Sequence, residues 1–408
     1  MRIGIVDGYA TSRFLVNELI ERDVICIHIK STPNPPSAYQ RVFDPSIYLE
    51  DLGYEPETEA IVSRLRQLGI EQVLAGAESG VELADTLNHL LGTPGNDIAF
   101  LDARRNKFAM TEIIRTAGLA SPESKVIQAA DQAVDWFRSR GSGPVVVKPL
   151  ASAGTDSVSI CNSAAEVRER CESILGSTNF FGVVNSSLVV QEYLVGHEYM
   201  VNTVALGGVH KVVDAWWAVR LNGPYGAPIV DFVEPVPLDT EEMRQVMDYT
   251  IDVVQALGIL NGAGHTEVML TSTGPVLIEC AARVMGGFLP WVSHRYSGTS
   301  QIHLLADSLT SPEIFEHFSY PTFSSHVRSV WLVNPAGGLG RADGWQRGIE
   351  QLPTFVALNS KVRPGQFIPP TVDLPSAPGF VYLAGTQADV QRDHRAIREM
   401  ELQGLYVD

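Results

Sequence analysis

The stretch that decides the fold is Gly264–Arg283, which reads GHTEVMLTSTGPVLIECAAR. It contains two apolar runs with strand-like composition, and a turn at Gly274-Pro275 separates them. Each run carries one glutamate, Glu267 in the first and Glu279 in the second. A hairpin of this spacing predicts that the two carboxylates lie side by side on one face of the sheet.

The predicted carboxylate pair suggests a metal site. Adjacent carboxylates repel each other, and apolar neighbours make their negative charge more costly. A divalent cation between them removes this cost, and carboxylate and phosphate oxygens together favour Mg²⁺. The alternative is two glutamates exposed to solvent, but the Val, Met, Leu, Ile and Cys residues around them argue against it.

Arg283 follows Glu279 by four residues. A guanidinium at this position can hold a substrate carboxylate and then the oxyanion of a tetrahedral intermediate. A plain salt bridge to Glu279 is the simpler alternative. The next residues, Met285-Gly286-Gly287, allow close backbone approach and suit the wall of a substrate pocket.

A second group of candidate residues lies upstream. Lys148 ends the strand-like run 145–149, and the small-residue loop 151–157 (ASAGTDS) follows it. Small residues let backbone N–H groups approach phosphate oxygens, and a lysine adds a mobile positive charge. The loop is therefore a candidate lid over phosphates, although taken alone an ordinary turn is the better interpretation. It is not a Walker A motif, because GxxxxGK[ST] is absent.

Two further features are weaker on their own. Lys107 opens a predicted helix, where a lysine is usually only solvated. Residues 189–199 form a strand, a short connection and another strand, whose backbone can meet an adenine edge. Gln191 can add a hydrogen bond, and Glu198 can accept both ribose hydroxyls. The alternative is a hairpin with a surface glutamate.

The N-terminal residues alternate between strand and helix patterns. Strands are predicted at 3–6, 24–29 and 72–75, with helical spacing around 14–20 and 61–68. This alternation predicts a parallel, doubly wound sheet, with a ligand at the strand C-termini near Asp7-Gly8 and Gly76–Ser79. Glu78 lies at such an end, where a helix-capping role is at least as reasonable as a functional one.

The remaining chain is mixed α and β. A helix is expected from near Asp102, a compact α+β unit over 126–195, and further strands near 200–206, 210–219, 265–270 and 275–280. From about residue 311 the chain becomes rich in Pro and Gly with short strand-like runs, which indicates a C-terminal α+β extension.

Composition limits the function classes. The 408 residues suggest two or three domains. A net charge of -17 disfavours nucleic-acid binding, and no apolar run reaches membrane-spanning length. The four cysteines have no CxxC spacing, and the N-terminus lacks a signal-peptide pattern. A cytoplasmic protein with reduced, packed thiols is expected.

Together these pieces resemble the ATP-grasp superfamily, and within it the chain looks most like the L-amino acid ligases that make dipeptides. The resemblance implies an α/β ATP-grasp fold in three parts. These are an N-terminal doubly wound domain (1–105), an ATP-grasp domain (106–310) with a lid subdomain at about 118–192, and a C-terminal α+β extension (311–408).

The resemblance also implies roles for individual residues. Glu267 and Glu279 would hold Mg²⁺, as two ions and with Mn²⁺ as an alternative, while Arg283 would stabilise the acyl-phosphate and tetrahedral states. Arg220, with Lys211 as second choice, would lie near the γ-phosphate. The ATP-binding set would be Lys107, Lys148, Ser152, Ala153, Gly154, Thr155, Gln191, Glu192, Tyr193, Leu194 and Glu198. One departure is Ala281, where many members carry an Asn metal ligand.

The implied reaction joins two amino acids through an acyl phosphate, with release of ADP and phosphate. His265 and His294 are candidate bases for the amine, although a structural role is favoured for each. Partners would be small amino acids and, as is common in related enzymes, a second copy of the chain. The alternatives are a ligase of the biotin-carboxylase or purine-pathway branch, and a regulatory ATP-binding protein without catalysis.

Overall fold

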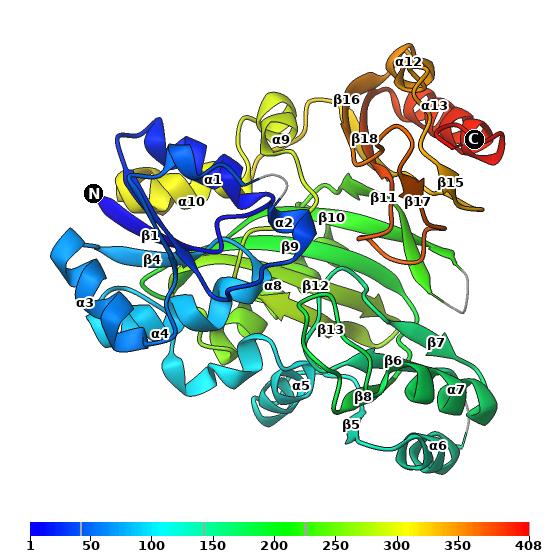
Figure 1. Cartoon of the computed structure of the whole chain (residues 1–408), viewed down its shortest axis with the longest axis horizontal. Helices are drawn as coiled ribbons and strands as arrows, with labels where there is room; N and C mark the ends of the chain where they lie inside the picture. The colour runs from blue at the N-terminus through cyan, green and yellow to red at the C-terminus, as the bar shows by residue number, and fades with distance from the viewer. Residues whose placement is uncertain (41–42, 142, 224–226, 408) are drawn as a thin grey trace.

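The computed structural model describes residues 1–40, 43–141, 143–223 and 227–407. Its N-terminal part, drawn in blue tones in Figure 1, is a four-stranded parallel sheet in the order β3-β2-β1-β4. The strands are β1 (Arg2–Val6), β2 (Ile25–Lys30), β3 (Glu50–Tyr54) and β4 (Gln72–Ala75). The helices are α1 (Ser12–Ile20), α2 (Ser37–Gln40), α3 (Thr58–Leu68) and α4 (Val81–Leu91). The predicted doubly wound sheet is confirmed, and β3 is an additional edge strand.

Four short 3₁₀ turns connect these elements and lead to the next helix. They span Pro45–Ile47, Glu78–Gly80, Ile98–Phe100 and Asp102–Arg104. Helix α5 (Lys107–Thr116) begins later than the expected start near Asp102. The Asn106 side chain accepts hydrogen bonds from the N–H groups of Phe108 and Ala109, which fixes this start.

A second sheet forms what we call the lid. Its strands are antiparallel, in the order β5-β8-β6-β7, and two helices pack on it. The elements are β5 (Ser124–Ile127), β6 (Val145–Pro149), β7 (Ser159–Cys161), β8 (Leu188–Glu192), α6 (Ala130–Ser139) and α7 (Ala164–Ile174). Cys161 and Cys171 are buried free thiols in its core, as are Cys26 and Cys280 elsewhere.

The central layer is an eight-stranded sheet in the order β13-β12-β9-β10-β11-β14-β18-β16. It contains β9 (His197–Leu206), β10 (Val209–Asn222), β11 (Pro228–Pro235), β12 (Gly262–Thr271), β13 (Gly274–Ala281), β14 (His326–Trp331), β16 (Phe355–Ser360) and β18 (Gly379–Gly385). The predicted C-terminal extension therefore continues this sheet across the β11–β14 pair.

The remaining elements surround this sheet. They are α8 (Glu241–Ala256), α9 (Pro290–Ser297), α10 (Gln301–Thr310), α11 (Pro312–Glu316), α12 (Gln346–Glu350), α13 (Gln387–Leu402), β15 (Gly338–Leu339) and β17 (Phe367–Ile368). Val246 and Val253 of α8 share a core with Tyr199 and Val268 of the sheet. No helix in the described ranges is long and apolar enough to span a bilayer.

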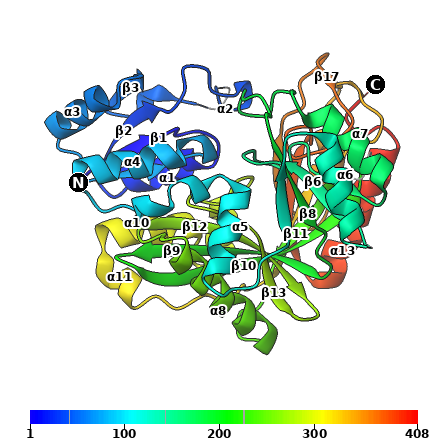
Figure 2. The ribbon, with the colours of Figure 1, turned by 90° about the horizontal axis from the view of Figure 1, so that it is seen from below.

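The connection 193–196 links the lid to the central sheet. Strand β8 pairs within the lid and β9 pairs with β10 and β12, so the two strands do not form a hairpin with each other. Figure 2 shows the lid to one side of the central strands. A Cβ at Gly196 would lie 2.0 Å from the carbonyl oxygen of Leu270, so only glycine lets the connection pass this close to the β12–β13 turn.

Candidate active site

The β12–β13 hairpin brings two carboxylates together. Glu267 and Glu279 are direct partners in the antiparallel register, as the sequence predicted. A register shift follows immediately between Glu267 and Val268. The two side chains are about one-quarter exposed, with relative exposures of 23% and 27%, so they face an accessible space rather than the core.

Two lysines approach this pair from different elements. Lys107, at the start of α5, donates from Nζ to Glu279 Oε1 at 2.8 Å and to the carbonyl oxygen of Ser152 at 2.9 Å. Lys148, at the end of β6, is buried. Burial and then the neighbouring charge of Lys107 lower the pKa of Lys148 to about 8. The negative charges of Glu279 and Glu267 offset part of this lowering of the Lys148 pKa.

Arg220 of β10 lies on the other side of the carboxylate pair. Its Nε donates to Glu198 Oε2 at 2.7 Å, and its Nη2 is 4.0 Å from Glu267 Oε2. Burial raises the pKa of Glu267, but the adjacent His265 and Arg220 outweigh that effect and hold it well below the ordinary value. Glu267 is therefore a carboxylate at neutral pH, which is the form that binds a cation.

Arg283 pairs with a residue of the N-terminal sheet. Its Nε donates to Glu78 Oε2 at 2.7 Å, and its Nη1 donates to the carbonyl oxygen of Val284 at 2.9 Å. Neither simpler interpretation from the sequence holds. The residue paired with Arg283 is not Glu279, and the Glu78 carboxylate caps no helix N-terminus but lies 4% exposed against Arg283.

The small-residue loop 151–157 has a defined shape. Gly154, Thr155 and Ser157 have φ angles of 72°, 64° and 58°, in the left-handed region that non-glycine residues rarely occupy. Asp156 holds the loop by accepting from Ser152 Oγ at 2.5 Å and from the N–H of Phe180 at 2.8 Å. Lys107 reaches the same loop through Ser152, so loop and carboxylates adjoin.

The predicted adenine-binding segment is only partly free to bind. Gln191 is buried in β8. The Glu192 carboxylate binds Arg140 Nη2 at 3.1 Å, and the Glu192 N–H donates to the carbonyl of Glu123. The Tyr193 N–H donates to the carbonyl of Pro144 at 3.3 Å. In the described part of the chain the Leu194 N–H has no partner, so Leu194 offers the hydrogen-bond donor of this segment.

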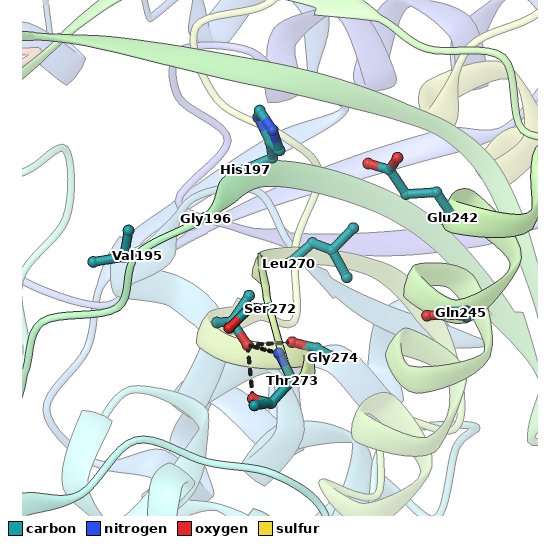
Figure 3. Close-up of a pocket in the computed structure, with 10 residues that line it drawn as sticks. Val195, Gly196, His197, Glu242, Gln245, Leu270, Ser272, Thr273 and Gly274 are labelled. Carbon is teal, nitrogen blue, oxygen red and sulfur yellow. Dashed lines mark hydrogen bonds between the residues drawn. The ribbon is translucent and has the colours of Figure 1, made fainter.

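A groove lies on the opposite face of the central sheet. It has a volume of about 870 Å³ and is lined by residues 195–197, by Glu242 and Gln245 of α8, and by the turn 270–274 (Figure 3). His197 and Tyr199 point to the α8 side, where the Tyr199 hydroxyl donates to Glu242. Glu198 points the other way, toward Arg220. The groove is therefore separate from the charged site.

Comparisons with known proteins identify the family. The ATP-grasp domain family matches residues 142–290. Dapdiamide A synthase of Enterobacter agglomerans is 32% identical over 395 residues, which cover 93% of this chain and 90% of that protein. The chain belongs to the ATP-grasp family. It is accordingly an ATP-binding enzyme of the carboxylate–amine ligase type.

Two solved structures show the same ATP-grasp fold. The L-amino acid ligase of Bacillus licheniformis superposes with a TM-score of 0.76 at 18% identity, covering 98% of this chain and 97% of that one. The biotin carboxylase domain of 2-oxoglutarate carboxylase from Hydrogenobacter thermophilus has a TM-score of 0.64 at 14% identity, covering 97% and 89%. The latter structure contains ADP and its magnesium salt.

The residues of this ATP-grasp chain fit a magnesium–nucleotide ligand in part. Glu267 and Glu279 supply adjacent carboxylate oxygens, which is the donor type that Mg²⁺ prefers. In the described ranges no group of three or more His, Cys, Asp or Glu residues has metal-binding geometry. A cation held by this pair would need further ligands, such as phosphate oxygens or water, and Ala281 has no side-chain atom that could serve as one.

A buried polar chain beside the site was missed at the sequence level. Asn202 Nδ2 donates to Asp214 Oδ1 at 2.6 Å, and Asn202 Oδ1 lies 2.9 Å from His265 Nδ1. Because the amide oxygen of Asn202 can only accept, His265 carries a proton on Nδ1 and turns Nε2 toward Glu267. The signal in the sequence is a polar residue inside an apolar strand, Asn202 in MVNTV and Asp214 in VVDAW.

The other candidate base, His294, lies elsewhere. Its ring stacks on His303 with centroids 4.3 Å apart, and His303 in turn contacts Ser300 and Glu18. These contacts belong to the packing of α9 and α10 against α1, so they support the structural role that the sequence favoured for His294.

Proposed function

We propose that this chain joins the carboxylate of one amino acid to the amine of a second, through an acyl phosphate, with release of ADP and phosphate. The proposal rests on one observation: Glu279 pairs with Lys107 and is close enough to act electrostatically on both Lys148 and Arg283, which Glu78 holds. The carboxylates and lysines suit a metal–nucleotide complex, and the Arg283–Glu78 pair suits a substrate that carries charge. The names of the relatives, dapdiamide A synthase and L-amino acid ligase, agree with this chemistry.

ATP would bind between the lid and the central sheet. The N–H groups of Ser152, Ala153, Gly154 and Thr155 would meet its phosphates, with Lys107 and Lys148 as counter-charges. Gln191 and the backbone at 192–194 would meet the adenine, with Leu194 as donor. Glu198 would accept the ribose hydroxyls while it remains paired with Arg220.

Mg²⁺ would be held by Glu267 and Glu279, as two ions and with Mn²⁺ as a substitute, and would supply neutralisation of phosphate charge. Lys107 donates to Glu279, and with a cation on that carboxylate its ammonium would be available to pair with a phosphate. Arg220 lies next to Glu267 and would support the γ-phosphate. The carboxylate oxygen of the first amino acid then attacks the γ-phosphorus, the bond from this phosphorus to the β–γ bridging oxygen breaks, and ADP leaves. This step depends on positioning and charge.

Amide formation would follow at Arg283. Its Nε and Nη1 are fixed by Glu78 and Val284, so the guanidinium plane is oriented before the substrate arrives. It would hold the acyl group and the oxyanion that forms when the neutral amine attacks the carbonyl. The lid excludes water, which would otherwise hydrolyse the acyl phosphate.

The test is incubation with ATP, Mg²⁺ and pools of amino acids, followed by mass spectrometry of the products. The proposal expects ADP and phosphate only when amino acids are present, together with a new dipeptide mass. Release of AMP and pyrophosphate would refute the acyl-phosphate route. Bicarbonate-dependent ADP release would indicate the carboxylase-like branch, and ATP binding without turnover would indicate a regulatory protein.

The wider organisation forms part of the same proposal. The chain would be divided at residues 105 and 310. Residues 1–105 would face the substrate, residues 106–310 would bind the nucleotide with a lid at about 118–192, and residues 311–408 would form a C-terminal extension. A cytoplasmic homodimer acting on free amino acids is the expected setting. Sedimentation of the purified protein measures the oligomeric state.

A further inference from the structure

Residues 371–376 form a hydrogen-bonded loop in the C-terminal region. Ser376 anchors it, because its N–H donates to Asp373 Oδ1 at 2.7 Å and its Oγ accepts from the N–H groups of Val372 and Asp373 at 2.9 and 3.0 Å. The N–H of Thr371 donates to the carbonyl of Asn334 at 2.8 Å. The loop is thus fixed by its own hydrogen bonds.

The tip of this loop touches residues 151–157, the candidate phosphate-binding loop, which we call the phosphate loop. The N–H of Leu374 donates to the carbonyl oxygen of Gly154 at 3.1 Å. A Cβ at Gly154 would lie 3.2 Å from Pro375 Cδ and 3.6 Å from Leu374 Cβ. From behind, Lys361 Nζ donates to the carbonyls of Leu374 and Pro375 at 2.8 and 3.2 Å. Lys361 therefore fixes the position of the tip through these two hydrogen bonds.

The phosphate loop is also held on its other side. Asp156 accepts from the N–H of Phe180, and the Phe180 ring makes an edge contact with Tyr39 at 5.6 Å between centroids. Tyr39 belongs to α2 of the N-terminal region. The lid is thus bridged to the C-terminal region through Gly154 and to the N-terminal region through Phe180.

We propose that Val372–Ser376 is a latch that holds the phosphate loop closed, and that Lys361 is a positioning residue for it. The proposal rests on the proposed function only in assigning residues 152–155 to ATP phosphates. A lid turning about residues 193–196 must break the Leu374–Gly154 hydrogen bond to admit nucleotide. One backbone hydrogen bond and a few side-chain contacts are weak enough to break and re-form in each cycle.

A reversible cross-link tests the latch. The 3.6 Å distance between the Gly154 Cβ position and Leu374 Cβ lies in the disulfide range of about 3.5–4.5 Å. The double variant G154C/L374C should therefore form an intramolecular disulfide on oxidation, while the four native cysteines stay buried. The single variants G154C and L374C are the matched controls. The probe is the association rate of a fluorescent ATP analogue.

The expected result is association at least tenfold slower in the oxidised double variant, with recovery on reduction and no effect of oxidation on either single variant. Failure to cross-link while both thiols react with maleimide would show that the two segments do not meet in solution. If the cross-linked protein binds nucleotide as fast as the same variant with its disulfide reduced, the contact between Leu374 and Gly154 need not open for binding and is only structural. Either result overturns the latch.

Lys361 gives a second, independent measurement. K361A should raise the KM for ATP threefold or more and leave the KM for amino acids unchanged, whereas K361R should retain the wild-type value. The control is K125A, at an exposed lysine on β5 of the lid. Equal ATP parameters in K361A and wild type would contradict the positioning role. Nucleotide association needs no ligation, so absence of dipeptide product would refute the proposed function and not the latch.

Discussion

Glu78 Oε2 accepts a hydrogen bond from Arg283 Nε at 2.7 Å, although the two residues are 205 positions apart in the chain. The glutamate lies at the C-terminal end of the parallel sheet, and the arginine follows the carboxylate hairpin. The pair therefore ties the N-terminal sheet to the site at which amide formation is proposed.

The first prediction concerns this pair. E78Q keeps the size of the side chain but removes its charge, so Arg283 should lose orientation while remaining in place. We expect kcat/KM for the amino acid that supplies the carboxylate to fall by roughly 10- to 100-fold, as after loss of one charge-assisted contact in a site. The Kd for ATP should stay within about twofold. Steady-state kinetics and calorimetry measure both.

The control for E78Q is E82Q. Glu82 lies on α4 and pairs with Arg105 at 3.3 Å, with a half-exposed side chain. It should lose less than about twofold in kcat/KM, since exposed pairs contribute little. Equal losses in the two variants would show that Glu78 has no special role.

The second prediction is a pH dependence of ATP binding. Lys148 has its pKa lowered from 10.5 to about 8 by burial and by Lys107, so the free enzyme loses this charge above pH 8. Bound phosphates favour the protonated form, so the complex keeps the proton to higher pH. The Kd for ATP should therefore rise as pH increases through 8, by up to about tenfold per unit. Titration calorimetry from pH 7 to 9.5 measures it.

K148R is the matched variant for this pH effect. Arginine stays charged across the whole range, so the rise in Kd above pH 8 should disappear even if the affinity at pH 7 is lower. A rise of the same size in K148R would assign the effect to another group.

The third prediction concerns the metal carboxylates. In wild type, MgADP should raise the thermal midpoint of unfolding, because a ligand that binds only the folded state stabilises it. E267Q and E279Q should lose most of the Mg²⁺-dependent part of this shift while the shift with ADP alone persists. Scanning fluorimetry with and without Mg²⁺ separates the two. E172Q, on α7 of the lid and paired with Arg168 at 3.6 Å, should behave like wild type.

The fourth prediction concerns Asp214, which is buried beneath the site. Burial raises its pKa from 3.8 to about 6, against the opposing hydrogen bond from Asn202. The folded state therefore binds a proton that the unfolded state releases, and stability falls as pH rises from 4 to 6. D214N removes this effect and keeps an acceptor for Asn202. Wild type loses this stability as pH rises and D214N does not. The unfolding free energy of D214N minus that of wild type should therefore increase by at most about 2–3 kcal/mol across that range.

Urea unfolding at pH 4, 5, 6 and 7 measures this difference. A constant difference at all four values would mean that Asp214 titrates normally in the folded protein. N202A should not reproduce the pattern, because it leaves the carboxylate buried with one hydrogen bond fewer.

The sequence could predict features that lie within one short segment. Glu267 and Glu279 share a hairpin, so strand alternation and the turn at Gly274-Pro275 were enough to place them opposite each other. The early strands and their parallel order followed from the spacing of apolar residues in the same way. The roles of these residues in binding ATP, Mg²⁺ and amino acids stay predictions.

Partners from distant segments could not be predicted. Nothing near Glu78 in the chain indicates Arg283, so a local helix-capping role was equally reasonable. Strand β11 was missed because Asp231 and Glu234 interrupt its apolar pattern. Their partners, Arg398 and Arg328, come from the C-terminal region, and only the folded chain supplies them.

The continuity of the central sheet past residue 310 determines how the chain can be divided. A protein shortened there would leave β11 with an open edge that invites pairing with other chains. It would also leave the carboxylates of Asp231 and Glu234 without their arginines. The change in sequence composition near residue 311 is therefore a poor place for a cut or a fusion junction, because β14, β16 and β18 beyond it complete the sheet that begins before it.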